Sequence, residues 1–194
     1  MASDETALDP ERRAAIAQRY GRLSSAFADK VAAVPAERWG SPSPCEDWTA
    51  RDVVQHVVDS SSMFFGFVGR EAPDAPTADE DPVAAFDAIR TAVQADLDDP
   101  ERAGTSFEGY AGRSTFADAV DRFLAFDLVV HGWDLARATG LDEAIDPGEL
   151  DRIAETAETM GPMLRSSGAF GAEVEVAPDA DQQARLLAFL GRQA

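Results

Sequence analysis

Apolar residues recur at steps of three and four over most of the chain, which is the spacing of one face of an α-helix. Four long segments show this pattern, at residues 10–34, 49–70, 82–99 and 115–139. Each segment begins with a helix-start signal: Pro10 and Pro82 each follow an aspartate, and Thr49 and Thr115 each stand three residues before one. The pattern therefore predicts four amphipathic helices.

The remaining segments predict smaller elements. Asp146 and Pro147 indicate the start of a fifth helix, and Asp179 with Gln182 predicts the cap of a short last one. The glycine-rich stretch "GTSFEGYAGRS" reads as a loop. With so little strand signal, we predict an all-α fold, a four-helix bundle over residues 1–168 with an additional C-terminal helical segment, followed by a short tail, 169–194, packed on it.

Composition narrows the choice of partners and location. The 194 residues are 45% hydrophobic, enough for one substantial core, and carry a formal net charge of -19. Such a charge repels nucleic acid and anionic membrane surfaces, so neither is expected as a partner. The single cysteine, Cys45, excludes an intrachain disulfide, and the first residues lack the apolar core of a signal peptide. We expect a cytoplasmic protein.

The most informative segment is "FLAFDLVVHGWDLARATG", residues 123–140. Helical spacing places Asp127, His131 and Asp134 on the face that should pack against the bundle. The other histidine of the chain, His56, lies in "DVVQHVVD", in the most apolar of the four helices. A buried carboxylate or imidazole needs a hydrogen bond, a counter-charge or a metal ion, because burial without a partner costs several kcal/mol.

Two interpretations of these residues remain open at this point. In the first, Asp127 and His131 form a hydrogen-bonded pair, and His56 is an ordinary core histidine. In the second, His56, Asp127 and His131 hold a divalent metal ion between facing helices, with positions open for water or substrate. Asp134 would then accept a hydrogen bond from His131, although a ligand role is also open to it. Cys45 is assigned to packing, with a redox or ligand role as the alternative.

The segments "SPCEDWTARDVVQHVV", "DLVVHGWDLARATG" and "FGAEVEVAPDADQQARLLAFLGR" resemble DinB-like proteins related to the metal-binding domain of mycothiol-dependent maleylpyruvate isomerase. The resemblance implies a four-helix bundle whose divalent metal is bound at positions that fall here on His56, Asp127 and His131. It favours Asp127 over Asp134 as the carboxylate ligand. The isomerase has glutamate where this chain has the shorter Asp127, and it carries a sizeable further C-terminal domain where this chain has a short tail.

The resemblance also implies a function. We expect a thiol-dependent transferase or isomerase of unknown substrate, whose metal is zinc, with nickel or another transition metal as alternatives. Its partners would be a low-molecular-weight thiol, mycothiol, and an electrophilic small molecule. The alternative is a non-catalytic bundle that binds a metal or a small ligand. A homodimer is left open, because an apolar helix face can pack within a chain or between chains.

Overall fold

The predicted helix-start signals cap the helices of the structure, a computed structural model that describes residues 8–109, 112–166 and 171–193. Asp9, Thr49, Asp81 and Thr115 each accept a hydrogen bond from a backbone N–H in the first turn of the following helix. The helices that they start are α1 (Pro10–Ala33), α2 (Ala50–Phe67), α3 (Pro82–Asp98) and α5 (Phe116–Ala119). These caps satisfy N–H groups that have no partner within their own helices.

The fourth long helix contains an irregular turn. α5 continues through a π-helical turn, η2 (Val120–Leu124), into α6 (Ala125–Thr139). Within that turn the N–H of Ala125 donates to the carbonyl oxygen of Val120, five residues back. The helix ends at Gly140, whose φ of 78° lies in the left-handed region. The predicted segment 115–139 is therefore one continuous helical rod with a local change of phase.

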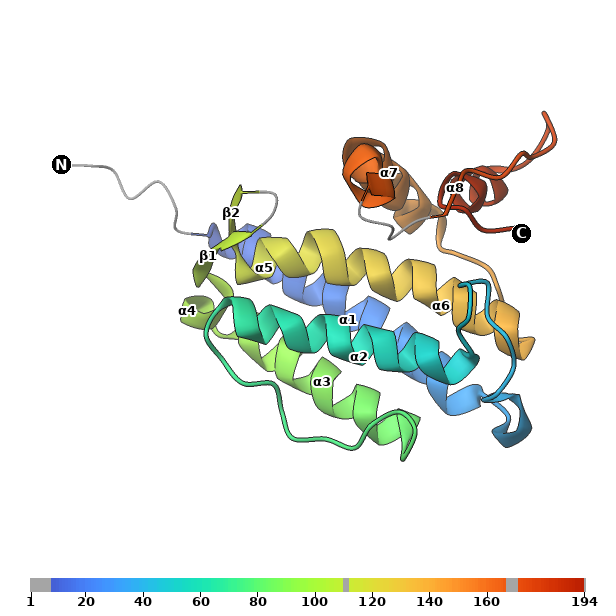
Figure 1. Cartoon of the computed structure of the whole chain (residues 1–194). Coiled ribbons are helices and arrows are strands. Elements are labelled where there is room, and N and C mark those ends of the chain that lie inside the picture. The colour runs from blue at the N-terminus through green and yellow to red at the C-terminus, as the bar shows by residue number, and fades with distance from the viewer. Residues whose placement is uncertain (1–7, 110–111, 167–170, 194) are drawn as a thin grey trace.

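α1, α2, α3 and the α5–α6 rod lie side by side and form the bundle (Figure 1). Their apolar faces meet in one core, in which the rings of Phe27 on α1 and Phe86 on α3 lie 4.7 Å apart. Short helical turns, η1 (Ala36–Arg38) and α4 (Pro100–Ala103), belong to the connections. The predicted all-α fold class, a four-helix bundle with an additional C-terminal helical segment, is confirmed. Among the described residues, every helix is too short or too polar to cross a bilayer.

The glycine-rich stretch predicted as a loop is instead a small antiparallel hairpin, β1 (Ser106–Gly109) and β2 (Gly112–Thr115). The ring of Phe107 on β1 stacks on that of Phe67 on α2, with centroids 5.3 Å apart. Glycines at 109 and 112 suggested a loop, but this tertiary contact and the pairing between the two strands hold residues 106–109 and 112–115 in extended conformation.

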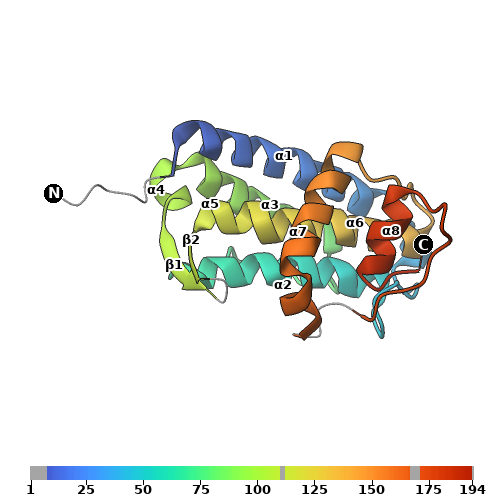
Figure 2. The same ribbon diagram turned by 90° about the horizontal axis from the view of Figure 1, so that it is seen from above.

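α7 (Pro147–Ser166) and α8 (Gln182–Phe189) form the additional C-terminal segment. Both lie outside the bundle over α6, and α7 runs crosswise to the bundle helices (Figure 2). The side chain that caps α8 is Asp181, which accepts from the N–H of Ala184, so the predicted cap at Asp179 is wrong by two residues. The predicted boundary between residues 168 and 169 lies outside the described residues.

A buried ion pair joins the start of α7 to α1 of the bundle. The guanidinium of Arg19 on α1 donates to Glu149 on α7, at 2.6 Å from Nη2 to Oε2, and to the carboxylate of Asp121 at 2.8 Å. The side chains of Arg19 and Glu149 are each 9% exposed. Removing the Glu149 charge therefore weakens bonds that water cannot replace.

The variant Glu149→Gln is expected to lower the free energy of unfolding by about 2 kcal/mol, because Arg19 keeps its bonds to Asp121 while losing its strongest acceptor. Urea denaturation measures this change. Glu158→Gln, at an exposed position of the same helix, is the matched control and should be within about 0.5 kcal/mol of the wild type. Equal effects of the two substitutions would contradict a role for the ion pair.

Two glycines with left-handed backbone provide a second matched pair. Gly140 has φ of 78° with nothing within 4 Å of a Cβ built on it, whereas a Cβ on Gly191, with φ of 81°, would lie 2.9 Å from the Cα of Gly171. Gly140→Ala should cost about 1 kcal/mol of stability through backbone strain alone. Gly191→Ala should cost about 2 kcal/mol, because the tail must also move. Thermal unfolding of both variants tests the difference.

Candidate metal centre

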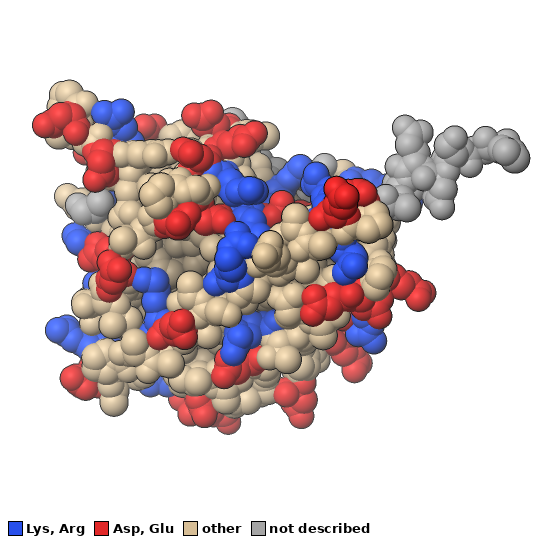
Figure 3. All heavy atoms as spheres, turned by 180° about the vertical axis from the view of Figure 1, so that it is seen from behind, with Lys and Arg blue, Asp and Glu red and all other residues tan. Residues whose placement is uncertain are grey.

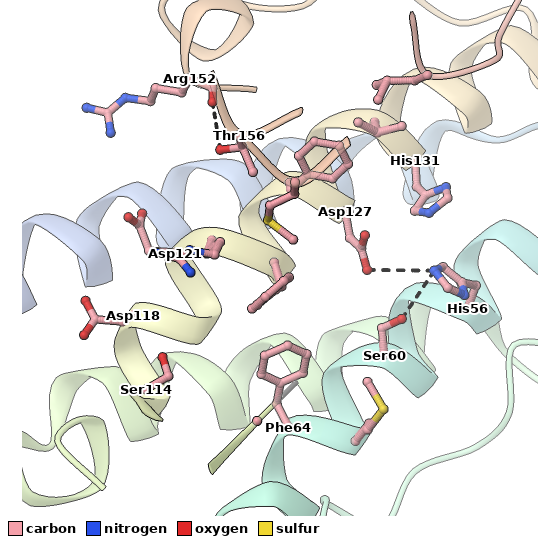
Figure 4. A pocket seen from close by; sticks show the side chains of 18 of the residues that line it. His56, Ser60, Phe64, Ser114, Asp118, Asp121, Asp127, His131, Arg152 and Thr156 are labelled. Carbon is pink, nitrogen blue, oxygen red and sulfur yellow. Dashed lines mark hydrogen bonds and ion pairs between the residues drawn. The ribbon is translucent and has the colours of Figure 1, made fainter. Parts of the chain in front are cut away.

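Two facing helices bring the predicted ligands together. His56 projects from α2, and Asp127 and His131 project from α6 toward it (Figure 4). One ligand atom from each of the three side chains lies within 4.8 Å of the other two. The imidazole rings of His56 and His131 have centroids 4.7 Å apart and planes inclined at 70°. Helical spacing places Asp127 and His131 on one face of α6, and in the structure both side chains point toward His56.

The spacing of these atoms suits a metal ion. Nε2 of His56 and Oδ2 of Asp127 are 3.8 Å apart, too far for a hydrogen bond. Two ligands that bind one tetrahedral ion through bonds of about 2.1 Å stand about 3.4 Å apart, so only a small adjustment is needed. Two imidazole nitrogens and one carboxylate oxygen are a donor set that zinc and other divalent transition metals accept. The residues therefore fit a divalent metal with further positions open.

Asp134 lies on the other side of His131. Its Oδ2 is 2.9 Å from Nδ1 of His131, so Nδ1 donates to the carboxylate and Nε2 remains as the nitrogen that can bind a metal. The Asp134 side chain is fully buried. Such a carboxylate fixes the orientation of the imidazole ring.

A residue of the tail completes the surroundings of Asp134. Arg192 donates from Nε to Oδ1 at 3.2 Å and from Nη2 to Oδ2 at 2.9 Å, and its side chain is 8% exposed. The thiol of Cys45 also donates to Oδ2 of Asp134, at 3.4 Å. Cys45, His131 and Asp134 are a second group of potential ligands, but hydrogen bonds already join them. We therefore assign the first group, with His56 and Asp127, as the candidate metal site.

The electrostatics of the two histidines differ. Burial lowers the pKa of His56, and the nearby charge of His131 lowers it further. Burial alone would also lower the pKa of His131, but the hydrogen bonds with Asp134 and Cys45 and the charge of Asp127 raise it to about 10. Burial raises the pKa of Asp134, yet the bonds from His131 and Arg192 outweigh it and bring the pKa to about 2. Because metals bind neutral imidazole, a metal ion that binds His131 would displace the proton that this raised pKa favours.

The site lies in the wall of a large cavity of about 1160 Å³, bounded by α2, the α5–α6 rod, the hairpin, α7 and the C-terminal tail. Trp48, just before α2, borders it, and its ring centroid is 4.8 Å from that of His56. Ser60, one turn after His56, has its Oγ 3.3 Å from Nε2 of that histidine. The three candidate ligands are therefore accessible to a small molecule.

Sequence reasoning missed several of these residues. Ser60 stands four positions after His56, which is a usable signal, whereas Arg192 is 58 residues from Asp134 and no local spacing points to it.

The protein is thus a helical bundle in which two imidazoles and one carboxylate on facing helices form a candidate metal site. Residues 20–136 match the family described as the mycothiol maleylpyruvate isomerase N-terminal domain, and the chain belongs to this family, whose domain is DinB-like. It is also similar to the uncharacterized proteins MT0763 and Rv0738 of Mycobacterium tuberculosis strains CDC 1551 and H37Rv. Each is 33% identical over 181 residues, covering 89% of this chain and 95% of the relative. No solved structure matches.

Proposed function

We propose that this protein is a divalent-metal-dependent transferase or isomerase that uses a low-molecular-weight thiol, mycothiol, to transform an electrophilic small molecule in the cytoplasm. The observation that carries the proposal is the meeting of His56, Asp127 and His131 in the wall of a cavity with room for a ligand. Zinc is the metal we propose. The family match to a mycothiol isomerase domain supports the choice of thiol.

Five side chains have tasks in this proposal. His56, Asp127 and His131 would hold the ion, and a bound ion would supply a thiolate nucleophile by lowering the pKa of a thiol that binds beside them. Asp134 keeps the ring of His131 in the tautomer whose Nε2 binds metal. The ring of Trp48 packs against that of His56, with centroids 4.8 Å apart, and so limits the orientations that His56 can adopt.

The test is thiol-dependent consumption of a generic electrophile, 1-chloro-2,4-dinitrobenzene, by the zinc-loaded chain with mycothiol. Activity should vanish in His56→Ala, vanish in the wild type after chelation, and return when zinc is added back. Glu158→Gln, exposed on α7, should retain activity. Equal turnover in chelated protein would exclude the mechanism. Stoichiometric zinc without any turnover would favour the non-catalytic metal-binding bundle instead.

A further inference from the structure

One wall of the cavity, away from the metal ligands, is apolar and partly exposed. Met63 and Phe67 on α2 are 51% and 36% exposed, although both belong to residue types that folded proteins bury. The rings of Phe64 and Phe123 are tilted by 50° with centroids 6.1 Å apart, and the ring of Phe107 in the hairpin stacks on that of Phe67. All five line the same cavity. We call them the apolar wall.

The lining of the cavity contains six arginines and five acidic residues, whereas the chain as a whole has 36 acidic and 17 basic residues. Arg113 on β2, Arg122 in η2 and Arg152 on α7 line the cavity and are exposed. Within the described part of the chain no carboxylate lies within 4.0 Å of their side-chain nitrogens, whereas the neighbouring Arg12 is paired with Asp118. Glu155 is an acidic residue in the same lining. We call Arg113, Arg122 and Arg152 the arginine rim.

Three arginines without an ion pair to a described carboxylate therefore lie along one cavity, where they present positive charge to a ligand. Figure 3 shows basic side chains gathered in a band at the centre of one face, with acidic side chains over much of the rest. A guanidinium group recognises carboxylate, sulfonate or phosphate oxygens through paired N–H donors. The arginine rim thus favours an anionic group on the ligand.

The two features lie in a cavity that also contains the metal ligands. In Figure 4, His56, Asp127 and His131 lie at one end of the pocket, and Ser114, Asp118 and Asp121 lie at the other, with Phe64 between them. The volume of about 1160 Å³ exceeds the range of about 300–1,000 Å³ that holds a single small ligand. There is room for a thiol at the metal and a second molecule along the apolar wall.

We propose that the electrophilic substrate of this site is an organic anion with an aromatic or similarly bulky apolar body. Its body lies on the apolar wall, and its anionic group is bound by the arginine rim. That the bound molecule is a substrate rests on the proposed function. The binding site itself is defined by the residues of the apolar wall and the arginine rim. A small dicarboxylate would leave the wall uncovered, and a neutral apolar molecule would leave the arginines unpaired.

The test is binding of 2-naphthoate and of the neutral, isosteric 2-naphthamide by isothermal titration calorimetry. The full chain is dialysed against EDTA, so that the carboxylate cannot gain affinity from a metal ion, and its helicity is checked by circular dichroism. Naphthoate should bind about tenfold more tightly than the amide, the factor expected of a charge-assisted hydrogen bond. Equal affinities, or no binding of either compound, would overturn the proposal.

Variants locate the ligand. Phe67→Ala should weaken both compounds several-fold, whereas the double variant Arg122→Gln/Arg152→Gln should weaken naphthoate alone and bring it close to the amide. Val83→Ala and Arg38→Gln, exposed positions away from the cavity, are the matched controls and should bind as the wild type does. If the wall and rim variants bind naphthoate with the affinity of the wild type, the ligand lies elsewhere and the proposal is overturned.

This experiment is independent of the proposed function. Binding is measured without metal, thiol or turnover, so a failure of the His56→Ala activity test leaves these affinities as they are. Conversely, loss of the naphthoate preference would overturn the substrate class while the thiol-dependent activity stands.

Discussion

His131→Ala is expected to weaken zinc binding by more than about 100-fold, beyond the range of about 10- to 100-fold that changes around a metal site produce without removing a ligand. His131 supplies one of the two imidazoles of the candidate site and is fixed by Asp134. Asp127→Asn should also weaken binding by at least about tenfold, because an amide oxygen is a poorer ligand than a carboxylate. Competition titration with a zinc indicator dye measures both affinities.

Asp134→Asn is the informative comparison for Asp127→Asn. Asp134 contacts His131 on the side away from His56, so its loss should weaken zinc binding less than the loss of Asp127 does. Asp59→Asn, an exposed carboxylate on α2, controls for the general change of charge. A larger loss at Asp134 than at Asp127 would mean that the two carboxylates have been assigned the wrong way round, and would favour the group with Cys45 as the metal site.

Arg192→Met is expected to lower the free energy of unfolding by about 3 kcal/mol, the lower end of the range for breaking a buried ion pair. The fully buried Asp134 would keep the hydrogen bonds from His131 and Cys45 but lose its bidentate partner. Methionine preserves most of the volume of the side chain, so the effect reports the lost pairing rather than a cavity. Urea denaturation at constant zinc concentration measures the change.

A double-mutant cycle separates pairing from general damage to the tail. The variant Asp134→Asn/Arg192→Met should be more stable than the sum of the single changes predicts, by about 1 kcal/mol or more, because the uncompensated charge is gone. Arg185→Met, an exposed arginine of α8, should change stability by less than about 0.5 kcal/mol. Additive single effects would show that Arg192 and Asp134 do not interact.

The helices were predictable because their signals are local. Proline after aspartate and threonine three residues before aspartate mark helix starts within a few residues, and apolar spacing marks the face that packs. The meeting of His56 with Asp127 and His131 followed from the same logic: each polar side chain lies on an apolar helix face, and a bundle has one interior for such faces. The role of the three residues as metal ligands remains a prediction.

Long-range contacts account for what the sequence could not predict. Arg192 reaches Asp134 from a tail segment whose position depends on how α7 and α8 pack. The hairpin forms where glycines favoured a loop, because the ring of Phe107 stacks on the ring of Phe67 on α2. Asp181 rather than Asp179 caps α8, and both aspartates offer a similar local signal. Tertiary packing determines which aspartate caps the helix and whether the glycine-rich stretch forms strands, and a local sequence pattern does not contain that information.

The π turn between α5 and α6 amounts to one extra residue in an otherwise regular helix. Each residue of an α-helix advances the side chains by about 100° around the axis. Without the extra residue, the rod would carry Asp127 and His131 out of alignment with the end that bears Phe116 and the Thr115 cap. The first half of the rod can therefore pack against the core and the hairpin while the second half presents Asp127 and His131 to His56. A single-residue deletion between Val120 and Leu124 would force these two halves to share one orientation.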